Sequence, residues 1–407
     1  MNCRHCGTQA NDVFLDLGFA PPSNAYRSSS DLRVPERHFP LKLVVCRRCW
    51  LVQTEDFAQA GELFGEDYAY FSSVSQTWLD HAARYVYETT ARLDLDHRSF
   101  VIEIAANDGY LLRNFVAAGI PCLGIEPTAG TAAAAERLGI PIVREFFGRD
   151  LAERLAAEGK QADLIIGNNV YAHVPDINDF TSGLKAALKP RGTITLEFPH
   201  LMQLIENAQF DTAYHEHFSY LSLHTVSGIF ASAGLRVYDV EELSTHGGSL
   251  RVFGCHAADP RADSATVARL IAAEARHGLR DVATYRSFQQ RADRIKDDLL
   301  VYLIGQKRAG KHVAAYGAAA KGNTLLNYAG VKPDLLPYVC DAAPSKQGKF
   351  LPGSHIPVVP PTALRERCPD VVLILPWNIK DEIMAQHDYV HDWGARFAVV
   401  IPALAIC

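Results

Sequence analysis

The chain has 407 residues, of which 48% are hydrophobic and 21% are charged, with 40 basic and 46 acidic side chains. This length predicts two large domains with a small module attached, because one hydrophobic core rarely extends over so many residues. The net charge of −6 argues against a nucleic-acid partner, since proteins that bind nucleic acid usually carry a basic surplus.

Hydropathy argues against a membrane partner. The longest clear apolar run covers residues 397–407, has 11 residues and includes Pro402, so we expect no transmembrane span. The N-terminus lacks the apolar stretch of a signal peptide. We therefore expect a cytoplasmic protein whose nine cysteines stay reduced.

Four of these cysteines form two Cys-x-x-Cys pairs near the N-terminus, namely Cys3 with Cys6 and Cys46 with Cys49. Each such turn aims two thiolates at one point, and two turns complete a tetrahedral zinc site with no open position. The predicted Zn²⁺ is therefore structural, and its binding can contribute roughly 10–16 kcal/mol to a module over residues 1–65. Accidental spacing and a redox pair are the alternatives, although neither pair lies in a βαβ context.

Strands and helices then alternate, after a helix predicted over residues 76–95. The predicted strands cover 99–105, 122–126, 142–145, 163–167 and 193–198, and the predicted helices cover 109–118, 128–138 and 177–188. This alternation predicts a parallel sheet with helices on both faces. A helix over 225–233 and a hairpin of strands 235–241 and 249–256, with a turn at Gly247-Gly248, complete a predicted class I methyltransferase (Rossmann-like) domain over 66–258.

Residues 259–407 predict a second Rossmann-like α/β domain. Apolar residues recur at helical spacing from Tyr285 to Leu303, which predicts one long packing helix. The predicted strands of this domain cover 313–316, 338–340, 371–375 and 397–401. The predicted architecture is thus an α/β chain of three units: a four-cysteine zinc module, a methyltransferase domain and a C-terminal domain.

The first sheet carries the pattern of an S-adenosylmethionine site. The strand that contains Glu103 runs into a turn of small and polar residues, which lets the backbone approach a cofactor. The next strand ends at Glu126, 23 residues later, near the ~20 expected for a carboxylate that binds a ribose diol. A third strand leads into Asn168. The predicted cofactor residues are Glu103, Ala105, Asn107, Asp108, Gly109, Glu126 and Asn168. A dinucleotide remains the alternative ligand.

The segment 210–220 combines His215, Glu216, His217 and Tyr214, residue types suited to proton transfer. An extended segment would place Tyr214 and Glu216 on one face and the two histidines on the other, whereas a helical one would place Tyr214 beside His217. Zinc ligation by the two histidines and buried, hydrogen-bonded histidines are competing interpretations.

A small-residue turn at 317–322 in the second sheet begins a helix, where backbone N–H groups suit an anion. Lys321 within this turn favours a diphosphate over a nicotinamide cofactor, because it adds a point charge at phosphate. A solvated surface lysine is the alternative.

Taken together, these residues resemble the three-domain, zinc-containing, S-adenosylmethionine-dependent C-methyltransferases of nucleotide-linked 4-keto-6-deoxy sugars, including the 3-C-methyltransferases of antibiotic deoxysugar biosynthesis. The resemblance extends over essentially the whole chain. It rests on both cysteine pairs, Tyr68-Ala69-Tyr70 with Ser72-Ser73, residues 103–109, Ala172-His173-Val174-Pro175, residues 214–218, His246-Gly247-Gly248 and residues 316–321.

The resemblance implies a role for each matching residue. His217 would take the proton from carbon 3, Tyr214 would assist at the carbon-4 oxygen, and Glu216 would orient the pair. Tyr68 would face the same site. Further substrate contacts would come from His173, Tyr70, Ser72, His246 and Lys321, with His173 and Lys321 at the diphosphate.

Two residues depart from the family pattern. His215 stands where we expect an acidic residue, and Phe71 replaces a more polar neighbour. These departures therefore allow a different sugar or nucleoside, although thymidine is favoured over guanosine. The exact sugar, the methylated carbon, its stereochemistry and the oligomeric state are left open. The alternatives are an O- or N-methyltransferase, an RNA-modifying methyltransferase and a non-catalytic nucleotide-sugar binding protein.

Overall fold

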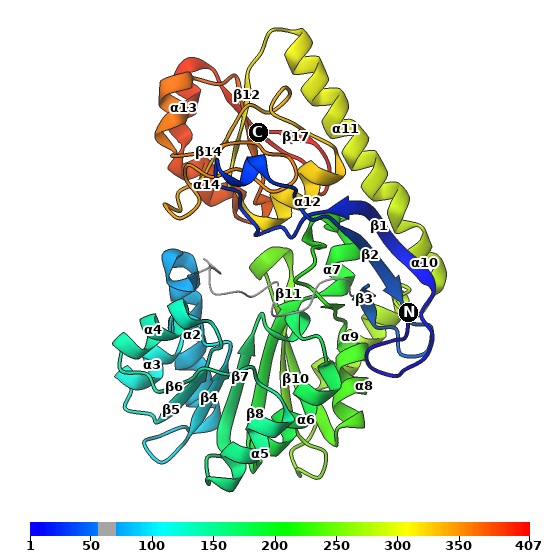
Figure 1. Ribbon diagram of the computed structural model, residues 1–407. Coiled ribbons are helices and arrows are strands. Elements are labelled where there is room, and N and C mark those ends of the chain that lie inside the picture. Colours follow the sequence, from blue (N-terminus) through cyan, green and yellow to red (C-terminus); the bar gives the residue numbers. More distant parts are fainter. Residues whose placement is uncertain (56–70) are drawn as a thin grey trace.

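The computed structural model describes residues 1–55 and 71–407. Its strands form three sheets of four, seven and six strands. The seven-stranded sheet lies below the six-stranded one in Figure 1, and the four-stranded sheet lies beside the long helix α11. The α/β architecture predicted from the sequence is therefore confirmed.

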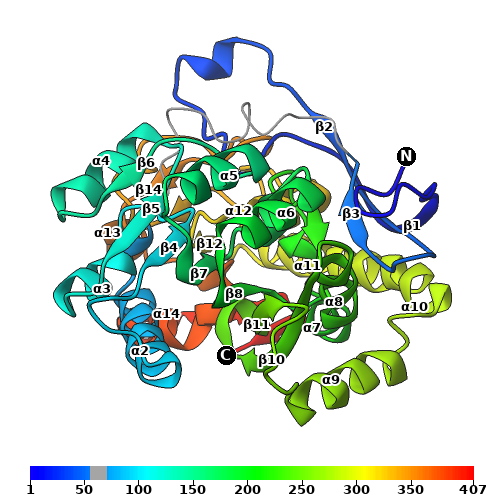
Figure 2. The same cartoon turned by 90° about the horizontal axis from the view of Figure 1, so that it is seen from below.

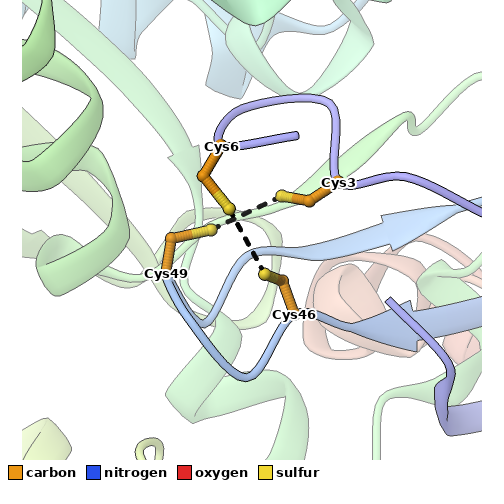
Figure 3. A group of neighbouring side chains, drawn as sticks. All are labelled: Cys3, Cys6, Cys46 and Cys49. Atoms are coloured by element: carbon orange, nitrogen blue, oxygen red, sulfur yellow. Dashed lines mark hydrogen bonds between the residues drawn. The ribbon is translucent and has the colours of Figure 1, made fainter. Parts of the chain in front are cut away.

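The four-stranded sheet has the order β1-β2-β3-β9 and is antiparallel throughout. Its strands are β1 (Asp12–Ala20), β2 (Phe39–Val45), β3 (Val52–Thr54) and β9 (Ser219–Tyr220). One cysteine pair lies in the turn between β2 and β3, and it faces the other pair across a short gap (Figure 3). The connection between β1 and β2, residues 21–38, contains one 3₁₀ turn, Asp31–Arg33. The last strand, β9, comes from a distant part of the chain.

The seven-stranded sheet has the order β10-β11-β8-β7-β4-β5-β6. Its strands are β4 (Val101–Ile104), β5 (Cys122–Ile125), β6 (Ile142–Val143), β7 (Ala162–Asn168), β8 (Leu188–Pro199), β10 (Leu235–Leu243) and β11 (Ser249–His256). β11 runs antiparallel to both of its neighbours, and the other ladders of this sheet are parallel. This is the predicted parallel sheet with a terminal hairpin. A 3₁₀ turn, Thr245–Gly247, lies in the hairpin connection.

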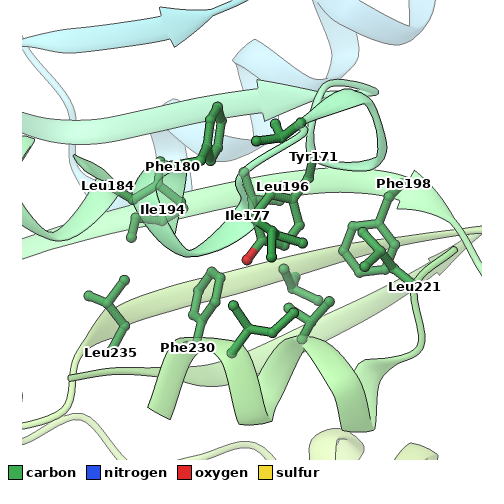
Figure 4. Packing of buried hydrophobic residues seen from close by; sticks show 14 of the residues in the cluster. Tyr171, Ile177, Phe180, Leu184, Ile194, Leu196, Phe198, Leu221, Phe230 and Leu235 are labelled. Carbon is green, nitrogen blue, oxygen red and sulfur yellow. The ribbon is translucent and has the colours of Figure 1, made fainter. Parts of the chain in front are cut away.

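Helices cover this sheet on both faces, as the view from below shows (Figure 2). They are α2 (Gln76–Leu93), α3 (Leu112–Ala117), α4 (Ala129–Arg137), α5 (Arg149–Ala157), α6 (Ile177–Ala187), α7 (Leu201–Glu206) and α8 (Leu223–Ser232). The helix α5 was not predicted. On one face, Phe180 and Tyr171 lie close to Ile194 and Leu196 of β8, with Phe230 of α8 beneath them (Figure 4).

The six-stranded sheet has the order β14-β13-β12-β15-β16-β17. Its strands are β12 (Val313–Tyr316), β13 (Val339–Cys340), β14 (Val358–Val359), β15 (Val371–Ile374), β16 (Arg396–Val399) and β17 (Ala405–Ile406). All its ladders are parallel except that of β17. The helices that follow β11 are α9 (Ala265–Arg276), which packs on β10 of the seven-stranded sheet, and then α10 (Val282–Arg286), α11 (Phe288–Arg308), α12 (Ala320–Tyr328), α13 (Thr362–Arg367) and α14 (Lys380–Gln386).

One prediction here was wrong: the single helix expected from Tyr285 to Leu303 is broken into α10 and α11 at Ser287. The Ser287 hydroxyl donates to the Thr284 carbonyl, a local bond of the kind that competes with a continuous helix. Tyr285 and Phe288 are nevertheless both buried against Phe14 of β1, so the predicted apolar face is present.

A shared core joins the three parts of the chain. One cluster of buried side chains contains Leu43 of β2, Phe210, Leu299 of α11 and Leu326 of α12. Because these residues come from all three parts of the chain, the three parts pack against one another as one body.

Within residues 1–55 and 71–407, no helix is long and apolar enough to cross a membrane.

Candidate active site

The chain bends sharply where β4 ends. Ala105, Asn107 and Gly109 all have positive φ, at 57°, 50° and 79°. Non-glycine residues rarely adopt this conformation, and a Cβ on Gly109 would come within 2.5 Å of Ile140 Cδ1. The bend therefore explains why small residues follow β4, and it exposes the backbone of the turn at the carboxyl end of the sheet.

Glu126 fastens this turn from the end of β5. One carboxylate oxygen accepts from the Asn107 backbone N–H at 2.9 Å, and the other accepts from that of Thr128 at 2.9 Å. Two such charge-assisted bonds fix the carboxylate in the plane of the turn. Both oxygens keep lone pairs for a ligand, so the geometry is compatible with the predicted ribose contact.

Four polar atoms around the turn are buried and have no protein partner among the described residues: Glu103 Oε2, Asp108 Oδ1, and Oδ1 and Nδ2 of Asn168. Burial, reinforced by the charge of Glu126, raises the pKa of Glu103 well above its usual value. Buried polar atoms normally have partners, so this group fits a polar ligand such as a nucleoside that carries an amino acid. The residues predicted for the cofactor therefore do converge, and they fit S-adenosylmethionine.

Ser72 lies against the same turn. Its backbone N–H donates to Asn107 Oδ1 at 3.0 Å, and that of Ser73 donates to Asp108 Oδ2 at 3.0 Å. Tyr68 and Tyr70, the other predicted residues of this segment, lie outside the described residues.

A second group of predicted residues meets around His217. The His217 N–H donates to the Tyr214 carbonyl at 2.9 Å, which closes a turn over residues 214–217. The turn brings the Tyr214 and His217 rings to 3.9 Å between centroids. Of the two arrangements considered for this segment, the extended one is wrong, and Tyr214 lies beside His217.

The ring of His217 is held in one orientation. Its Nδ1 lies 2.9 Å from the Thr212 carbonyl, which can only accept, so Nδ1 carries the proton and Nε2 carries the lone pair. Burial, with the neighbouring His173, lowers the pKa of His217 well below its usual value. His217 is therefore neutral near pH 7, as a general base must be.

His173 and Glu216 complete this group. The rings of His173 and His217 are 4.6 Å apart, and His173 Nδ1 lies 2.9 Å from the Glu216 carbonyl. The Glu216 carboxylate accepts from Asn24 Nδ2 at 2.8 and 2.9 Å, and burial raises its pKa to about 7. Asn24 comes from the N-terminal unit, and no local pattern marked it as a site residue.

His215 points elsewhere. Its Nε2 lies 3.2 Å from the Pro40 carbonyl and 3.3 Å from that of Phe39, at the start of β2. The interpretation of His215 and His217 as joint zinc ligands is therefore wrong, because the two rings have different partners.

His246 and Lys321 lie around the same space from two other elements. His246, at φ 55°, lies between Asn169, whose Nδ2 is 3.4 Å from its Nε2, and the Trp78 ring at 5.2 Å. Lys321, in the first turn of α12, donates to Asn378 Oδ1 at 3.0 Å. Burial, with the charge of Lys321, lowers the pKa of His246 to about 4.

The C-terminal sheet contains a carboxylate that sequence reasoning missed. Asp341, at the end of β13, accepts from the backbone N–H of Ala318 at 2.7 Å and from that of Ala343 at 2.8 Å. This repeats the arrangement of Glu126 in the first sheet. Its signal was present, because Asp341 lies 24 residues after Gly317, near the ~20 that separates the glycine turn and acid of a nucleotide fold.

A buried charge cluster beneath the site was also missed. Glu197 of β8 accepts from Arg251 Nε at 2.8 Å and lies 3.1 Å from His81 Nε2, and His81 stacks on Trp78. These residues come from α2, β8 and β11, so no local spacing could have indicated the cluster. It fixes Trp78 beside His246 and Tyr110.

The zinc prediction is supported by the thiol geometry. All four Sγ atoms of Cys3, Cys6, Cys46 and Cys49 lie within 4.8 Å of one another, and the closest pairs are 3.5 Å apart (Figure 3). A tetrahedron with Zn–S bonds of 2.3 Å has edges of about 3.8 Å. The four thiols therefore fit one zinc ion.

The zinc module touches the segment that contains His217. Strand β3 pairs with β9, with Val52 opposite Tyr220, and the Thr54 N–H donates to the Phe218 carbonyl at 3.2 Å. The Thr54 hydroxyl donates to the carbonyl of His217 itself. The position of His217 thus depends on a strand that begins three residues after Cys49.

Three family models match successive parts of the chain: a zinc binding domain over residues 3–64, a methyltransferase domain over 78–240 and a C-methyltransferase C-terminal domain over 244–402. The C-methyltransferase NovU of Streptomyces niveus is 36% identical over 403 residues, which are 98% of this chain and 95% of NovU. The chain belongs to the zinc-containing C-methyltransferases. This C-methyltransferase uses S-adenosylmethionine as its cofactor.

Two solved methyltransferases match the C-methyltransferase over 44% and 43% of its length. Magnesium protoporphyrin IX methyltransferase of Synechocystis PCC 6803, with bound SAH, is 14% identical over 44% of this chain and 83% of its own, at a TM-score of 0.34. The glycopeptide N-methyltransferase MtfA, complexed with sinefungin, is 14% identical over 43% of this chain and 94% of its own, at a TM-score of 0.34.

Loss of one zinc ligand should unfold the zinc module of the C-methyltransferase. We expect Cys46→Ser to lose its bound zinc, measured by plasma mass spectrometry, and to lose several kcal/mol of stability, on the order of the binding energy of such sites. Cys407→Ser, at an exposed cysteine far from the cluster, is the matched control. One zinc per chain in Cys46→Ser would contradict the assignment.

The Thr54 hydroxyl should matter more for turnover than for stability. We expect Thr54→Val to lose only about 1 kcal/mol in urea unfolding, as for one hydrogen bond. Methyl transfer should slow severalfold, because the His217 carbonyl loses its donor. Thr54→Ser keeps the hydroxyl and should retain wild-type turnover; equal losses in both variants would show that the hydroxyl is not responsible.

Proposed function

We propose that this C-methyltransferase methylates carbon 3 of a nucleotide-linked 4-keto-6-deoxy sugar, with thymidine diphosphate as the favoured nucleotide. The pairing of Tyr214 with a neutral His217 carries the proposal. Methylation of carbon needs a carbanion equivalent, and a ketone provides one when a base removes the adjacent proton. Transfer to oxygen or nitrogen would not need a base held in this way.

His217 is the proposed base. Its Nδ1 proton is committed to the Thr212 carbonyl, so Nε2 receives the proton from carbon 3 and the electron pair moves into the enolate. A base in hydrogen-bond reach contributes on the order of 10²–10⁴ to the rate.

Tyr214 is the proposed donor to the carbon-4 oxygen, where negative charge develops. One well-placed donor of this kind contributes about 3–4 kcal/mol to transition-state stabilisation. Glu216 orients the pair through the turn that it shares with both residues, and Asn24 holds its carboxylate. On the family resemblance, Tyr68 would also face the site.

Residues 103–109 with Glu126 and Asn168 would hold S-adenosylmethionine, which supplies an electrophilic methyl group when bound. Glu126 would accept from the ribose hydroxyls, and the unpartnered atoms of Asp108 and Asn168 would bind the polar ends of the cofactor. Ser72, bonded to Asn107, would connect this turn with the substrate.

The C-terminal sheet would hold the nucleotide. Lys321 and His173 would contact the diphosphate, and His246 and Tyr70 would contact the sugar. The carboxylate of Asp341, fixed like that of Glu126, supports a nucleoside at the neighbouring strand end. The ammonium of Lys321 would supply positive charge to the diphosphate of this anionic substrate.

His217→Asn should abolish proton exchange at carbon 3 because it removes the base. The measurement is NMR of a thymidine-diphosphate 4-keto-6-deoxy sugar in deuterium oxide, without cofactor. Wild-type enzyme should exchange the carbon-3 proton, and the variant should slow exchange at least 100-fold while binding S-adenosylmethionine normally.

His215→Asn is the matched control, since His215 is a buried neighbour that faces β2. It should leave the exchange within a fewfold of wild type. Undiminished exchange in His217→Asn would remove His217 from the role. Mass spectrometry with thymidine- and guanosine-linked 4-keto sugars would decide the nucleoside.

Glu126→Gln should weaken cofactor binding about 10-fold, the effect of losing one charge-assisted bond of ~1.4 kcal/mol. An amide has one acceptor oxygen and cannot accept from both backbone N–H groups and a ribose. Calorimetric titration with S-adenosylmethionine measures the loss. Glu153→Gln, at an exposed glutamate of α5, should bind like wild type; equal affinity in both variants would place the ribose elsewhere.

A further inference from the structure

Trp377 crosses from the C-terminal domain to the segment that contains His217. It begins the 3₁₀ turn Trp377–Ile379, and its indole Nε1 donates to Asp211 Oδ2 at 2.8 Å. Asp211 lies in the 3₁₀ turn Phe210–Thr212, whose last residue accepts the Nδ1 proton of His217. One hydrogen bond thus joins the C-terminal domain to the short turn that orients His217.

The indole ring also fixes the connection that contains His246. Gly247 has φ 88°, and a Cβ on it would overlap Trp377 Cη2. The Gly247 carbonyl accepts from Gln209 Nε2 at 2.7 Å, next to the Asp211 turn. The Trp377 indole therefore packs against Gly247, where a larger residue would not fit. It lies between the connection that contains His246 and the 3₁₀ turn that contains Asp211.

Lys321 lies against the same ring. Its Nζ is 4.4 Å from the Trp377 ring centroid and donates to Asn378 Oδ1 at 3.0 Å. An ammonium near an indole face is attracted by the ring quadrupole. Asp211 is fully buried, and its Oδ1 has no hydrogen-bond partner in the part of the chain described.

We propose that Asp211 and Trp377 are positioning residues that keep Lys321 charged and aimed at the diphosphate of the substrate. This rests on the proposed function, because it takes Lys321 as a diphosphate ligand. Asp211 is an unsuitable ligand for a diphosphate, since two anions repel. Its role is to balance a cation that would otherwise be isolated in a buried site.

The electrostatics agree with this assignment. Burial lowers the pKa of Lys321 to about 8, and the charge of Asp211 opposes that shift. Burial raises the pKa of Asp211 to about 6, so its carboxylate is ionised above that pH. Among the described residues, the charge of Lys321 also acts on His246 and His217, and it lowers the pKa of both. Removal of the Asp211 charge should therefore lower the pKa of Lys321 further.

The test is calorimetric titration of the zinc-loaded enzyme with thymidine 5′-diphosphate between pH 6.5 and 9. Wild-type affinity should fall as the pH rises through about 8, where Lys321 loses its proton. Asp211→Asn keeps an acceptor for Trp377 and removes the charge. We expect its alkaline loss about one pH unit lower, with about fivefold weaker binding at pH 8.

Steady-state kinetics separate positioning from general damage. Asp211→Asn should raise the KM for the nucleotide sugar about fivefold at pH 8, leave kcat within twofold and leave S-adenosylmethionine affinity unchanged. Trp377→Phe keeps a ring but loses the N–H, and it should weaken thymidine 5′-diphosphate binding with a smaller shift in pH. Asp388→Asn, at an exposed aspartate of the same domain, is the matched control.

Lys321→Arg in the Asp211→Asn background makes the test independent of folding defects. A guanidinium stays charged up to pH 9, so the alkaline loss should disappear in the double variant. A pH profile of Asp211→Asn that superimposes on wild type would overturn the proposal, as would an unchanged alkaline loss in the double variant. Wild-type enzyme that binds no nucleoside diphosphate would instead refute the proposed nucleotide site itself.

Discussion

The pairing of β3 with β9 is the constraint on which the rest of the site depends. Strand β9 has two residues and would not form alone. It is stable because β3 belongs to a sheet whose turn between β2 and β3 contains two of the four clustered cysteines. The zinc ion has no catalytic role here, but the strand that it stabilises holds the backbone of His217 in place.

The three parts of the chain meet at the segment 211–217, and each supplies something that the others lack. The N-terminal unit supplies Asn24, which holds Glu216, and Ser23, whose carbonyl accepts from Asn323 of α12 at 2.6 Å. The C-terminal domain supplies Thr324, whose hydroxyl donates to the Ala213 carbonyl at 2.8 Å. These bonds explain why the reactive segment lies in a junction of domains and not at the end of one sheet.

Local features of the site could be predicted from the sequence, and long-range ones could not. The cysteine spacing, the turn after β4 and the position of Glu126 depend on residues within about 20 positions of one another, so pattern and spacing indicate them. Asn24 meets Glu216 across 192 positions, and Trp377 meets Asp211 across 166. Such contacts form only when separate units pack together, and a single sequence does not indicate which residues of two units will meet. The prediction of one continuous helix through Ser287 failed for a different reason. The apolar residues keep the same spacing with or without a break, so periodicity does not indicate the break.

Burial sets the chemistry of the segment through opposite effects on its acids and bases. It lowers the pKa of His217 and His173, which keeps both rings uncharged at pH 7. It raises the pKa of Glu216 to about 7 and that of Asp211 to about 6. Each carboxylate accepts from a neutral donor, an amide or an indole, that belongs to another part of the chain. A neutral donor fixes an oxygen without cancelling its charge, whereas an arginine would have held it as an inert ion pair. These bonds hold the segment in one conformation while both carboxylates can still change protonation state near pH 7. The proposed proton transfer from carbon would require both properties.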